Sequence, residues 1–299
     1  MIQARNVVKS FDGFQALRGT TLHVRRGCIY GLVGPNGAGK STIIRHIAGI
    51  YKPEAGEIYI DGQPIWENVE LKQRIAYIPD EIFYYQGASI DDMCKFYRAI
   101  YKNFDIELFG KLEEFFPKIN RKKKIRSLSK GMQKQVAFWL AISCRPDVLI
   151  LDEPVDGLDP VMRKQVWSIL MKEVADRRMT VLVSSHNLRE LEDVCDHVGI
   201  MSEGSVILER SLEEMQENTI KIQMAFEGEM PDMSDIRDIL HVSNSGRVIT
   251  VIAKGNAAQI TAQIEAKRPL FYDLLPLTLE EIFIYELGGT DYEVKDILL

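Results

Sequence analysis

The sequence predicts an α/β fold built on a parallel β-sheet, followed by a small second α/β domain. Three observations lead to this prediction: short apolar runs at residues 29–33, 148–151 and 180–185, a glycine-rich loop that joins the first run to a helical pattern, and a one-sided strand and a hairpin pattern beyond about residue 211. Short, continuously apolar runs are typical of strands buried on both faces. The 299 residues, 46% of them hydrophobic, suffice for one large and one small domain.

The loop after the first apolar run fits the pattern Gly-x-x-x-x-Gly-Lys-Ser/Thr. Its glycines allow successive backbone N–H groups to converge on an anion, and the helix that begins here adds the positive end of its dipole. We expect Lys40 to contact the outer phosphates of a nucleotide and Ser41 to coordinate Mg²⁺. The predicted binding residues are Gly34, Pro35, Asn36, Gly37, Ala38, Gly39, Lys40, Ser41 and Thr42. The pattern predicts a P-loop nucleoside triphosphatase.

The second apolar run, at residues 148–151, is followed by two carboxylates, Asp152 and Glu153. Ligands of open α/β sheets bind at the carboxyl ends of the strands. Asp152 is predicted to hold Mg²⁺, and Glu153, on the opposite side of the strand pleat, to polarise the attacking water. We therefore expect catalysis of nucleotide hydrolysis, with Lys40 stabilising the phosphates.

Four further segments occur in a characteristic order along the first 210 residues. They are Phe11 near the start, Ser-Leu-Ser-Lys-Gly-Met-Gln at 127–133, Val-Asp-Gly-Leu-Asp-Pro at 155–160, and His186 after the run at 180–185. Together with the phosphate loop they resemble the ATP-binding subunits of ABC transporters. The resemblance implies a P-loop NTPase (ABC ATPase) fold over residues 1–210 with a helical subdomain at about 83–145. It also implies ATP and Mg²⁺ as ligands, Phe11 stacked on adenine, and His186 as a catalytic phosphate sensor.

The segment at 127–133 precedes an apolar-periodic helix, so Ser129 and the backbone of Gly131 are expected to form a second anion site at a helix N-terminus. The resemblance implies that this site closes over the nucleotide of a second ATPase subunit, in a homodimer or a heterodimer. It further implies a separate polytopic membrane permease subunit as partner. The segment 127–133 resembles the family's signature sequence in its Leu-Ser-Lys-Gly-Met form, and this form together with the short C-terminal domain resembles prokaryotic exporters of drugs, antibiotics or lipids.

Asp80 departs from the family pattern, which usually has Gln after the strand expected at residues 75–79. Aspartate still offers an oxygen to Mg²⁺, so we expect Asp80 to be a metal ligand with altered metal dependence. A regulatory module with slow hydrolysis is one alternative function. A soluble ABC ATPase acting on ribosomes or DNA is another, although such proteins usually carry two cassettes or a long coiled coil.

Net charge and hydropathy limit where the protein is expected in the cell and which partners it is expected to bind. A net charge of −6 argues against a general nucleic-acid binder, so no nucleic acid is expected. No apolar run approaches the length of a membrane span and the start lacks a signal peptide pattern, which predicts a cytoplasmic protein, peripheral on the inner face of the cell membrane. The basic run at 121–126 reads as a solvated loop or as a site for anionic lipid or an acidic partner.

Residues 83–126 are expected to form a helical insertion, with Ser89 capping a helix whose apolar stripe (Met93, Phe96, Tyr97, Ile100 and Tyr101) is interpreted as core. The aromatic residues at 82–85 fit either a permease interface or local packing.

Residues 211–299 predict a small accessory domain. Its expected elements are a strand at 219–226, a hairpin around residues 244–246, a helix opened by Asn256, a capping box at Thr278 before a last helix, and a mobile acidic tail. Packing or dimerisation is its simplest role, with ligand-dependent regulation as the alternative.

Overall fold

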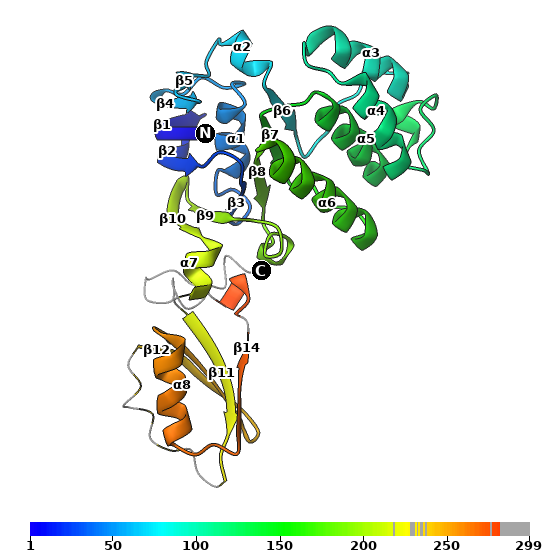
Figure 1. Ribbon diagram of the computed structural model, residues 1–299. Helices are drawn as coiled ribbons and strands as arrows, with labels where there is room; N and C mark the ends of the chain where they lie inside the picture. The colour runs from blue at the N-terminus through cyan, green and yellow to red at the C-terminus, as the bar shows by residue number, and fades with distance from the viewer. Residues whose placement is uncertain are drawn as a thin grey trace. The chain divides into compact units, whose positions relative to one another are not determined.

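The computed structural model describes residues 1–217, 219–227, 231, 233, 236, 238–275 and 277–281. The chain divides into two compact units (Figure 1). The first comprises Met1–His186 and Val194–Glu209, and the second comprises Asn187–Asp193 and the chain from Arg210 onward. The short segment 187–193 therefore groups with the second unit. Within the described residues, no helix is both long enough and apolar enough to cross a membrane.

A six-stranded sheet forms the centre of the first unit, with strand order β10-β9-β3-β8-β7-β6. Neighbouring strands from β9 to β6 are parallel. Every residue of β3, β7 and β8 is buried, as the continuous apolar runs predict. The strands are β3 (Ile29–Val33), β6 (Ile75–Ile78), β7 (Val148–Asp152), β8 (Thr180–Ser185), β9 (His197–Ser202) and β10 (Ser205–Ser211). Parallel pairing brings the carboxyl ends of β3, β7 and β8 to one edge, which positions the site.

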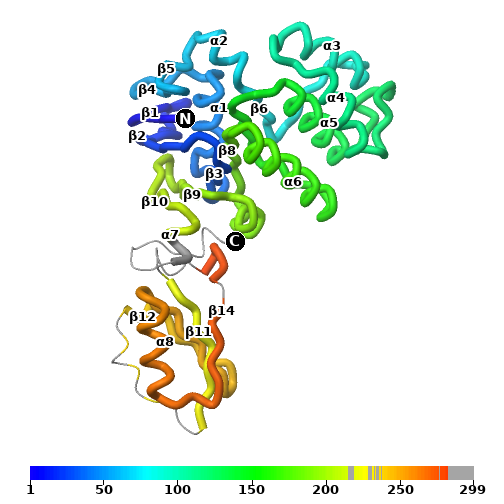
Figure 2. The backbone as a smooth tube through the Cα atoms, viewed as in Figure 1, coloured from blue at the N-terminus to red at the C-terminus, as the bar shows by residue number. Residues whose placement is uncertain are grey.

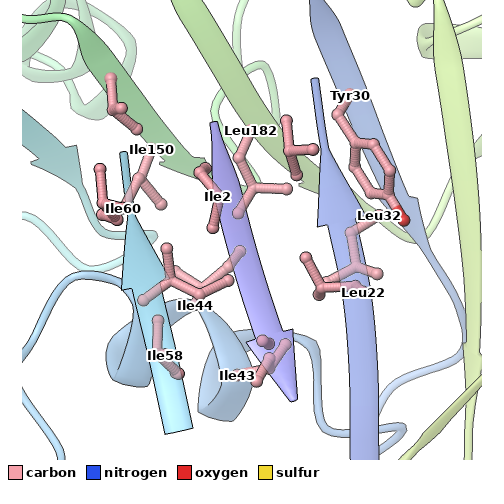
Figure 3. Close-up of a cluster of buried hydrophobic side chains, with 14 of the residues drawn as sticks. Ile2, Leu22, Tyr30, Leu32, Ile43, Ile44, Ile58, Ile60, Ile150 and Leu182 are labelled. Carbon is pink, nitrogen blue, oxygen red and sulfur yellow. The ribbon is translucent and has the colours of Figure 1, made fainter. Parts of the chain in front are cut away.

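A second, antiparallel sheet has the order β2-β1-β4-β5. Its strands are β1 (Ile2–Phe11), β2 (Phe14–Val24), β4 (Ala55–Ile60) and β5 (Gln63–Pro64). Helix α1 (Lys40–Ile47) lies between the two sheets (Figure 3), where Ile43 and Ile44 of α1 meet Ile2 of β1 and Leu182 of β8 in one buried cluster. This apolar packing fixes the start of α1, and with it the phosphate loop.

The remaining helices of the first unit are α2 (Val69–Lys72), α3 (Ile90–Ile100), α4 (Ile106–Leu112), α5 (Lys130–Ser143) and α6 (Pro160–Arg177), with 3₁₀ turns at Glu113–Phe115 and Ile125–Ser127. Helices α3, α4 and α5 gather in a separate group beside the sheets (Figure 1). Trp139 of α5 stacks on Phe109 of α4 at 4.8 Å between ring centroids and donates a hydrogen bond to its carbonyl oxygen at 2.7 Å. A buried aromatic core thus holds this helical group together.

Helix α3 begins as predicted, because Ser89 and Asp92 form a reciprocal capping box. The interpretation of its apolar stripe as core is wrong in part. Ile90, Met93 and Cys94 are buried, whereas Phe96 and Ile100 are 38% and 44% exposed. The helix turns its Ile90–Met93–Cys94 face inward, which leaves Phe96 and Ile100 at the surface and Tyr97 half-buried. Phe96 there forms an edge contact with the exposed ring of Tyr85, which in turn contacts Phe83.

The second unit contains a four-stranded antiparallel sheet of order β12-β13-β11-β14 with α8 packed on one face (Figure 2). Its elements are a 3₁₀ turn at Leu188–Glu190, α7 (Leu212–Glu217), β11 (Thr219–Ala225), β12 (Ile239–Ser245), β13 (Val248–Lys254), α8 (Ala257–Ala266) and β14 (Phe271–Leu275). The predicted strand, hairpin and Asn256 cap are confirmed. Strand β14 was not predicted.

The predicted capping box at the end of the second unit is present, since Thr278 Oγ1 accepts from the N–H of Glu281 at 3.2 Å and Glu281 accepts from the N–H of Thr278 at 3.1 Å. The continuation of this helix through Ile282, Phe283 and Leu287, and the acidic tail, lie outside the described residues.

Candidate functional site

The phosphate loop joins β3 to α1 at the carboxyl edge of the parallel sheet. Two of its glycines are required by the backbone. A Cβ atom at Gly34 would clash with the carbonyl oxygen of Met201, and Gly39 has a φ of 103°, which L side chains rarely adopt. Helix α1 begins directly after Gly39, at Lys40. The loop therefore has the tight turn and the helix N-terminus that phosphate binding needs.

Lys40 is 6% exposed, and its ammonium lies at the centre of this loop. It donates to the carbonyl oxygens of Gly34 at 2.6 Å and Pro35 at 3.2 Å, and lies 3.7 Å from Oε1 of Glu153. Burial lowers the pKa of Lys40, while the carboxylates of Glu153 and Asp152 oppose that shift. A cation is thus held at the strand edge where outer phosphates are predicted to bind.

Ser41 and Asp152, the two predicted metal ligands, are brought together by the fold. Ser41 Oγ donates to Oδ1 of Asp152 at 3.1 Å. The carboxylate is 1% exposed, and Ser184 Oγ at the end of β8 donates to the same oxygen at 2.6 Å. Hydroxyl and carboxylate oxygens are the donors that Mg²⁺ prefers, so this pair fits the implied ion.

Glu153 lies directly after β7, between two other predicted residues. Its Oε2 is 2.9 Å from Nδ1 of His186, and its Oε1 faces Lys40. With a φ of 47°, Glu153 adopts the left-handed conformation, so it leaves the strand pleat that the sequence analysis assigned to it. The structure nevertheless brings together Lys40, Glu153 and His186, the three residues predicted to be catalytic.

Asp80 lies just beyond β6, and its described contact is with Lys134 of α5. The distance between Nζ and Oδ1 is 3.4 Å, and the Asp80 side chain is 53% exposed. Asp80 is thus paired with a lysine in this structure, and its role as a metal ligand stays a prediction.

Phe11, the predicted adenine-stacking residue, ends β1 and is 40% exposed. The edge of Tyr51 contacts its ring at 5.7 Å between centroids, and Lys9 Nζ lies 5.3 Å from the ring centroid. An exposed ring that is held by its neighbours is suited to stacking on a base.

Ser129 caps α5, because its Oγ accepts from the N–H of Met132 at 3.3 Å. Ser129 and Gly131 line a groove of 720 Å³ together with Gly157 and Leu158 from the segment 155–160 and Val161 of α6. The described residues that line this groove include none from the phosphate loop. The two predicted anion sites of the chain are therefore separate.

Sequence reasoning missed Ser184, Lys134 and Tyr51. Ser184 accepts a hydrogen bond from the N–H of Glu153 at 3.1 Å and donates to Asp152. Ser184 could have been found from the sequence, because it is a polar residue at the end of a buried strand. The carboxyl ends of parallel strands meet at one edge of the sheet, so it reaches the same edge as Asp152. Lys134 and Tyr51 meet the site only through packing of α5 and the segment after α1, which no local pattern reveals.

Comparisons with known proteins agree with this geometry. The family model for ABC transporters matches residues 17–156. The chain is 34% identical over 289 residues to the ABC transporter ATP-binding protein YtrB of Bacillus subtilis, covering 97% of this chain and 99% of that protein. The chain belongs to the family of ABC transporter ATP-binding proteins.

Other members of the ABC family are also similar. The Nod factor export ATP-binding protein I of Burkholderia orbicola is 31% identical over 297 residues, with 95% of both proteins covered. A solved ATP-binding subunit of an ABC transporter is 27% identical, covers 72% of this chain and 92% of its own, and has a TM-score of 0.67. The fold is that of an ABC ATPase, as predicted, and ATP is the nucleotide of the site.

Proposed function

We propose that this chain hydrolyses ATP with Mg²⁺ to power a separate membrane permease, and that the transport is export. The observation that carries the proposal is the convergence of Lys40, Glu153 and His186 beside the Ser41–Asp152 pair at one sheet edge. Phosphoryl transfer requires a cation for the phosphates, a base for the attacking water and oxygen ligands for the metal ion, all at one place.

Each residue has a role that follows from its position. Lys40 binds the outer phosphates and, with the N–H groups of residues 34–42, orients them. Glu153 accepts a proton from the attacking water, and His186, hydrogen-bonded to Glu153, holds its carboxylate toward the nucleotide. Ser41 and Asp152 would hold Mg²⁺, which when bound neutralises charge on the phosphates. Phe11 stacks on the adenine, and Asp80 stays a candidate for contact with the metal.

A second ATPase subunit completes the site in this proposal. Ser129 and Gly131 lie in a groove that is separate from the phosphate loop, so they are placed to close over the nucleotide of a partner chain. The N-terminus of α5, capped by Ser129, supplies N–H groups for that contact. The partner is either a second copy of this chain or a related subunit.

The aromatic surface formed by Phe83, Tyr85 and Phe96 is the proposed docking site for the permease. Phe83 and Tyr85 are 72% and 50% exposed, and their rings contact one another at 5.9 Å between centroids. Clustered exposed aromatic residues are enriched in protein interfaces. This assignment places the chain in the cytoplasm, peripheral on the inner face of the cell membrane.

The direction of transport rests on similarity in names and organisation. A relative that aligns with 95% of this chain is named for Nod factor export, and the alignment extends through the second unit. We assign residues 1–210 to the ABC ATPase domain, with a helical subdomain at about 83–145, and residues 211–299 to an accessory domain for packing or dimerisation.

Affinity purification of the tagged chain from detergent-solubilised membranes, with and without ATP, tests the proposal. A stoichiometric polytopic membrane protein among the bound chains is the expected result. Ribosomal or DNA-associated proteins in its place would replace the transport function with one of the soluble alternatives. The Glu153→Gln variant is purified in parallel as a control. It should bind ATP and retain the partner although it no longer hydrolyses ATP.

A further inference from the structure

Lys134 of α5 connects two parts of the nucleotide site. Its side chain is 12% exposed, and its ammonium lies 2.8 Å from the backbone carbonyl oxygen of Glu153 and 3.4 Å from Oδ1 of Asp80. A lysine this buried, with its charge directed at a carbonyl oxygen, has its position defined by those contacts rather than by solvent.

The backbone of Glu153 is strained and held on both sides. Its φ of 47° is a conformation that residues other than glycine adopt at a cost, and such conformations persist where surrounding contacts impose them. Ser184 Oγ accepts from its N–H at 3.1 Å, and Lys134 donates to its C=O at 2.8 Å. These two contacts fix the direction in which the Glu153 side chain leaves the main chain.

That direction determines the catalytic geometry. From this backbone, the carboxylate of Glu153 reaches His186 Nδ1 at 2.9 Å and Lys40 Nζ at 3.7 Å. A peptide free to relax from the left-handed region would swing the carboxylate away from both groups. The contact of Lys134 with the Glu153 carbonyl therefore controls the carboxylate, although the lysine does not touch it.

We infer that Lys134 is a positioning residue for ATP hydrolysis, which holds Glu153 in its left-handed conformation and makes it responsive to Asp80. The inference rests on the proposed role of Glu153 as the base. Lys134 acts on the rate of the chemical step, and ATP binding does not depend on it.

Lys134 could serve to neutralise Asp80 or to hold the carbonyl group of Glu153, and the two roles predict effects of different size on turnover. If Lys134 served mainly to neutralise Asp80, its effect would be small, because an ion pair at 3.4 Å with a half-exposed carboxylate is weak. The contact with the Glu153 carbonyl is shorter and better shielded from water. Because Asp80 contacts the same ammonium, its carboxylate is connected to Glu153 through Lys134, and Asp80 lies in the loop that leads to Phe83 and Tyr85, the proposed docking residues.

The test compares Lys134→Met and Lys134→Arg with Lys172→Met, which removes one exposed lysine of α6 as a control. We expect Lys134→Met to lower kcat by about 100-fold, since small misplacements of a catalytic group have effects of that size, while KM and equilibrium ATP binding stay within about 2-fold of wild type. Lys134→Arg should recover most of the turnover, and Lys172→Met should match wild type. An unchanged kcat in Lys134→Met, or a loss confined to KM or ATP binding, would overturn the inference.

A double-mutant cycle with Asp80→Asn tests the connection through Lys134. Asp80→Asn should change kcat more in the wild-type background than in the Lys134→Met background, because any direct contact of Asp80 with the metal is present in both. An equal effect in both backgrounds would overturn the connection. Glu153→Gln, measured in parallel, distinguishes a failure of the proposed role of Glu153 from a failure of the proposed role of Lys134. If it retains turnover, the role of Glu153 fails and the inference with it. If it is inactive while Lys134→Met is normal, the inference alone fails.

Discussion

His186 and Glu153 form a hydrogen bond of 2.9 Å between the imidazole Nδ1 and the carboxylate Oε2. The two residues come from neighbouring parallel strands, since Glu153 follows β7 and His186 follows β8. The other carboxylate oxygen faces Lys40 at 3.7 Å. One carboxylate thus lies between a histidine and a lysine, which restrains it from both sides at the edge where the nucleotide is expected.

The first prediction concerns this hydrogen bond. His186→Ala should reduce ATP turnover by about 100-fold, because the general base loses the group that orients it, while ATP binding changes little. Steady-state hydrolysis and equilibrium nucleotide binding measure the two quantities. His241→Ala, on the exposed strand β12 of the second unit, is the control and should behave as wild type. Turnover by His186→Ala at the wild-type rate would remove the histidine from the mechanism.

The second prediction concerns Ser184, whose hydroxyl connects Asp152 to the N–H of Glu153. Ser184→Ala should lower turnover by about 10-fold and raise the Mg²⁺ concentration needed for half-maximal activity, because groups that orient metal ligands have effects of this size. Titration of activity with Mg²⁺ measures both. Ser205→Ala, in β10, is the control. An unaltered Mg²⁺ titration would show that Asp152 is positioned without Ser184.

The third prediction concerns adenine stacking on Phe11. Phe11→Ala should weaken ATP binding by about 10-fold, the effect of losing one base–aromatic stack. The measurement is equilibrium binding of ATP under conditions in which the chain does not hydrolyse it. Phe14→Ala is a close control, because Phe14 is 62% exposed and is the first residue of β2, paired with Phe11 at the end of β1. Equal losses in both variants would point to general damage to this hairpin and against stacking.

Most of the site could be predicted from the sequence because its residues sit at the ends of strands. A buried parallel strand has a distinctive apolar run, and the residue after it necessarily reaches the carboxyl edge. Lys40, Asp152 and His186 each follow or flank such a run, so their convergence follows from strand pairing alone. In the accessory sheet, β11 was predicted from its one-sided pattern and the β12–β13 hairpin from two apolar stretches around a turn, whereas β14 was not predicted.

What the sequence could not predict depends on contacts between distant segments. Nothing local indicates that Lys134 reaches the Glu153 carbonyl, because the contact depends on how α5 packs against the end of β7. The left-handed backbone of Glu153 also conflicts with its apparent place in a strand pattern. Phe96 and Ile100 show the converse limit, because helical periodicity identifies an apolar face but not whether a neighbour covers it.

The fourth prediction concerns the aromatic surface. Replacing Phe83 and Tyr85 with serine should reduce the amount of membrane partner that co-purifies by about 10-fold or more, as expected for central aromatic residues of an interface. ATP binding should be unchanged, because the described ring contacts of Phe83 and Tyr85 are with each other, Phe96 and Arg126, and none is with the phosphate loop. Val69→Ser, at a 67% exposed position on α2, removes an apolar side chain elsewhere and should retain the partner. Retention by the double variant would locate docking on another surface.

The fifth prediction concerns pH and His46 of α1, which is 1% exposed and lies 2.8 Å from the carbonyl oxygen of Thr42 through Nδ1. Burial lowers the pKa of its imidazole below the ordinary value of 6.5. Because the folded-state pKa is below the unfolded one, stability is greatest above 6.5 and falls as the pH drops through the interval between the two values.

Thermal unfolding midpoints measured from about pH 8 to about pH 5.5 test this dependence, since unperturbed histidine titrates within that range. The wild-type midpoint should fall toward the acidic end. His46→Phe keeps an aromatic ring beside Tyr51 but cannot take up a proton, so its midpoint should depend less on pH even if it is lower overall. Parallel curves for wild type and His46→Phe would mean that the responsible proton binds elsewhere, because only a group whose pKa differs between the folded and unfolded states makes stability depend on pH.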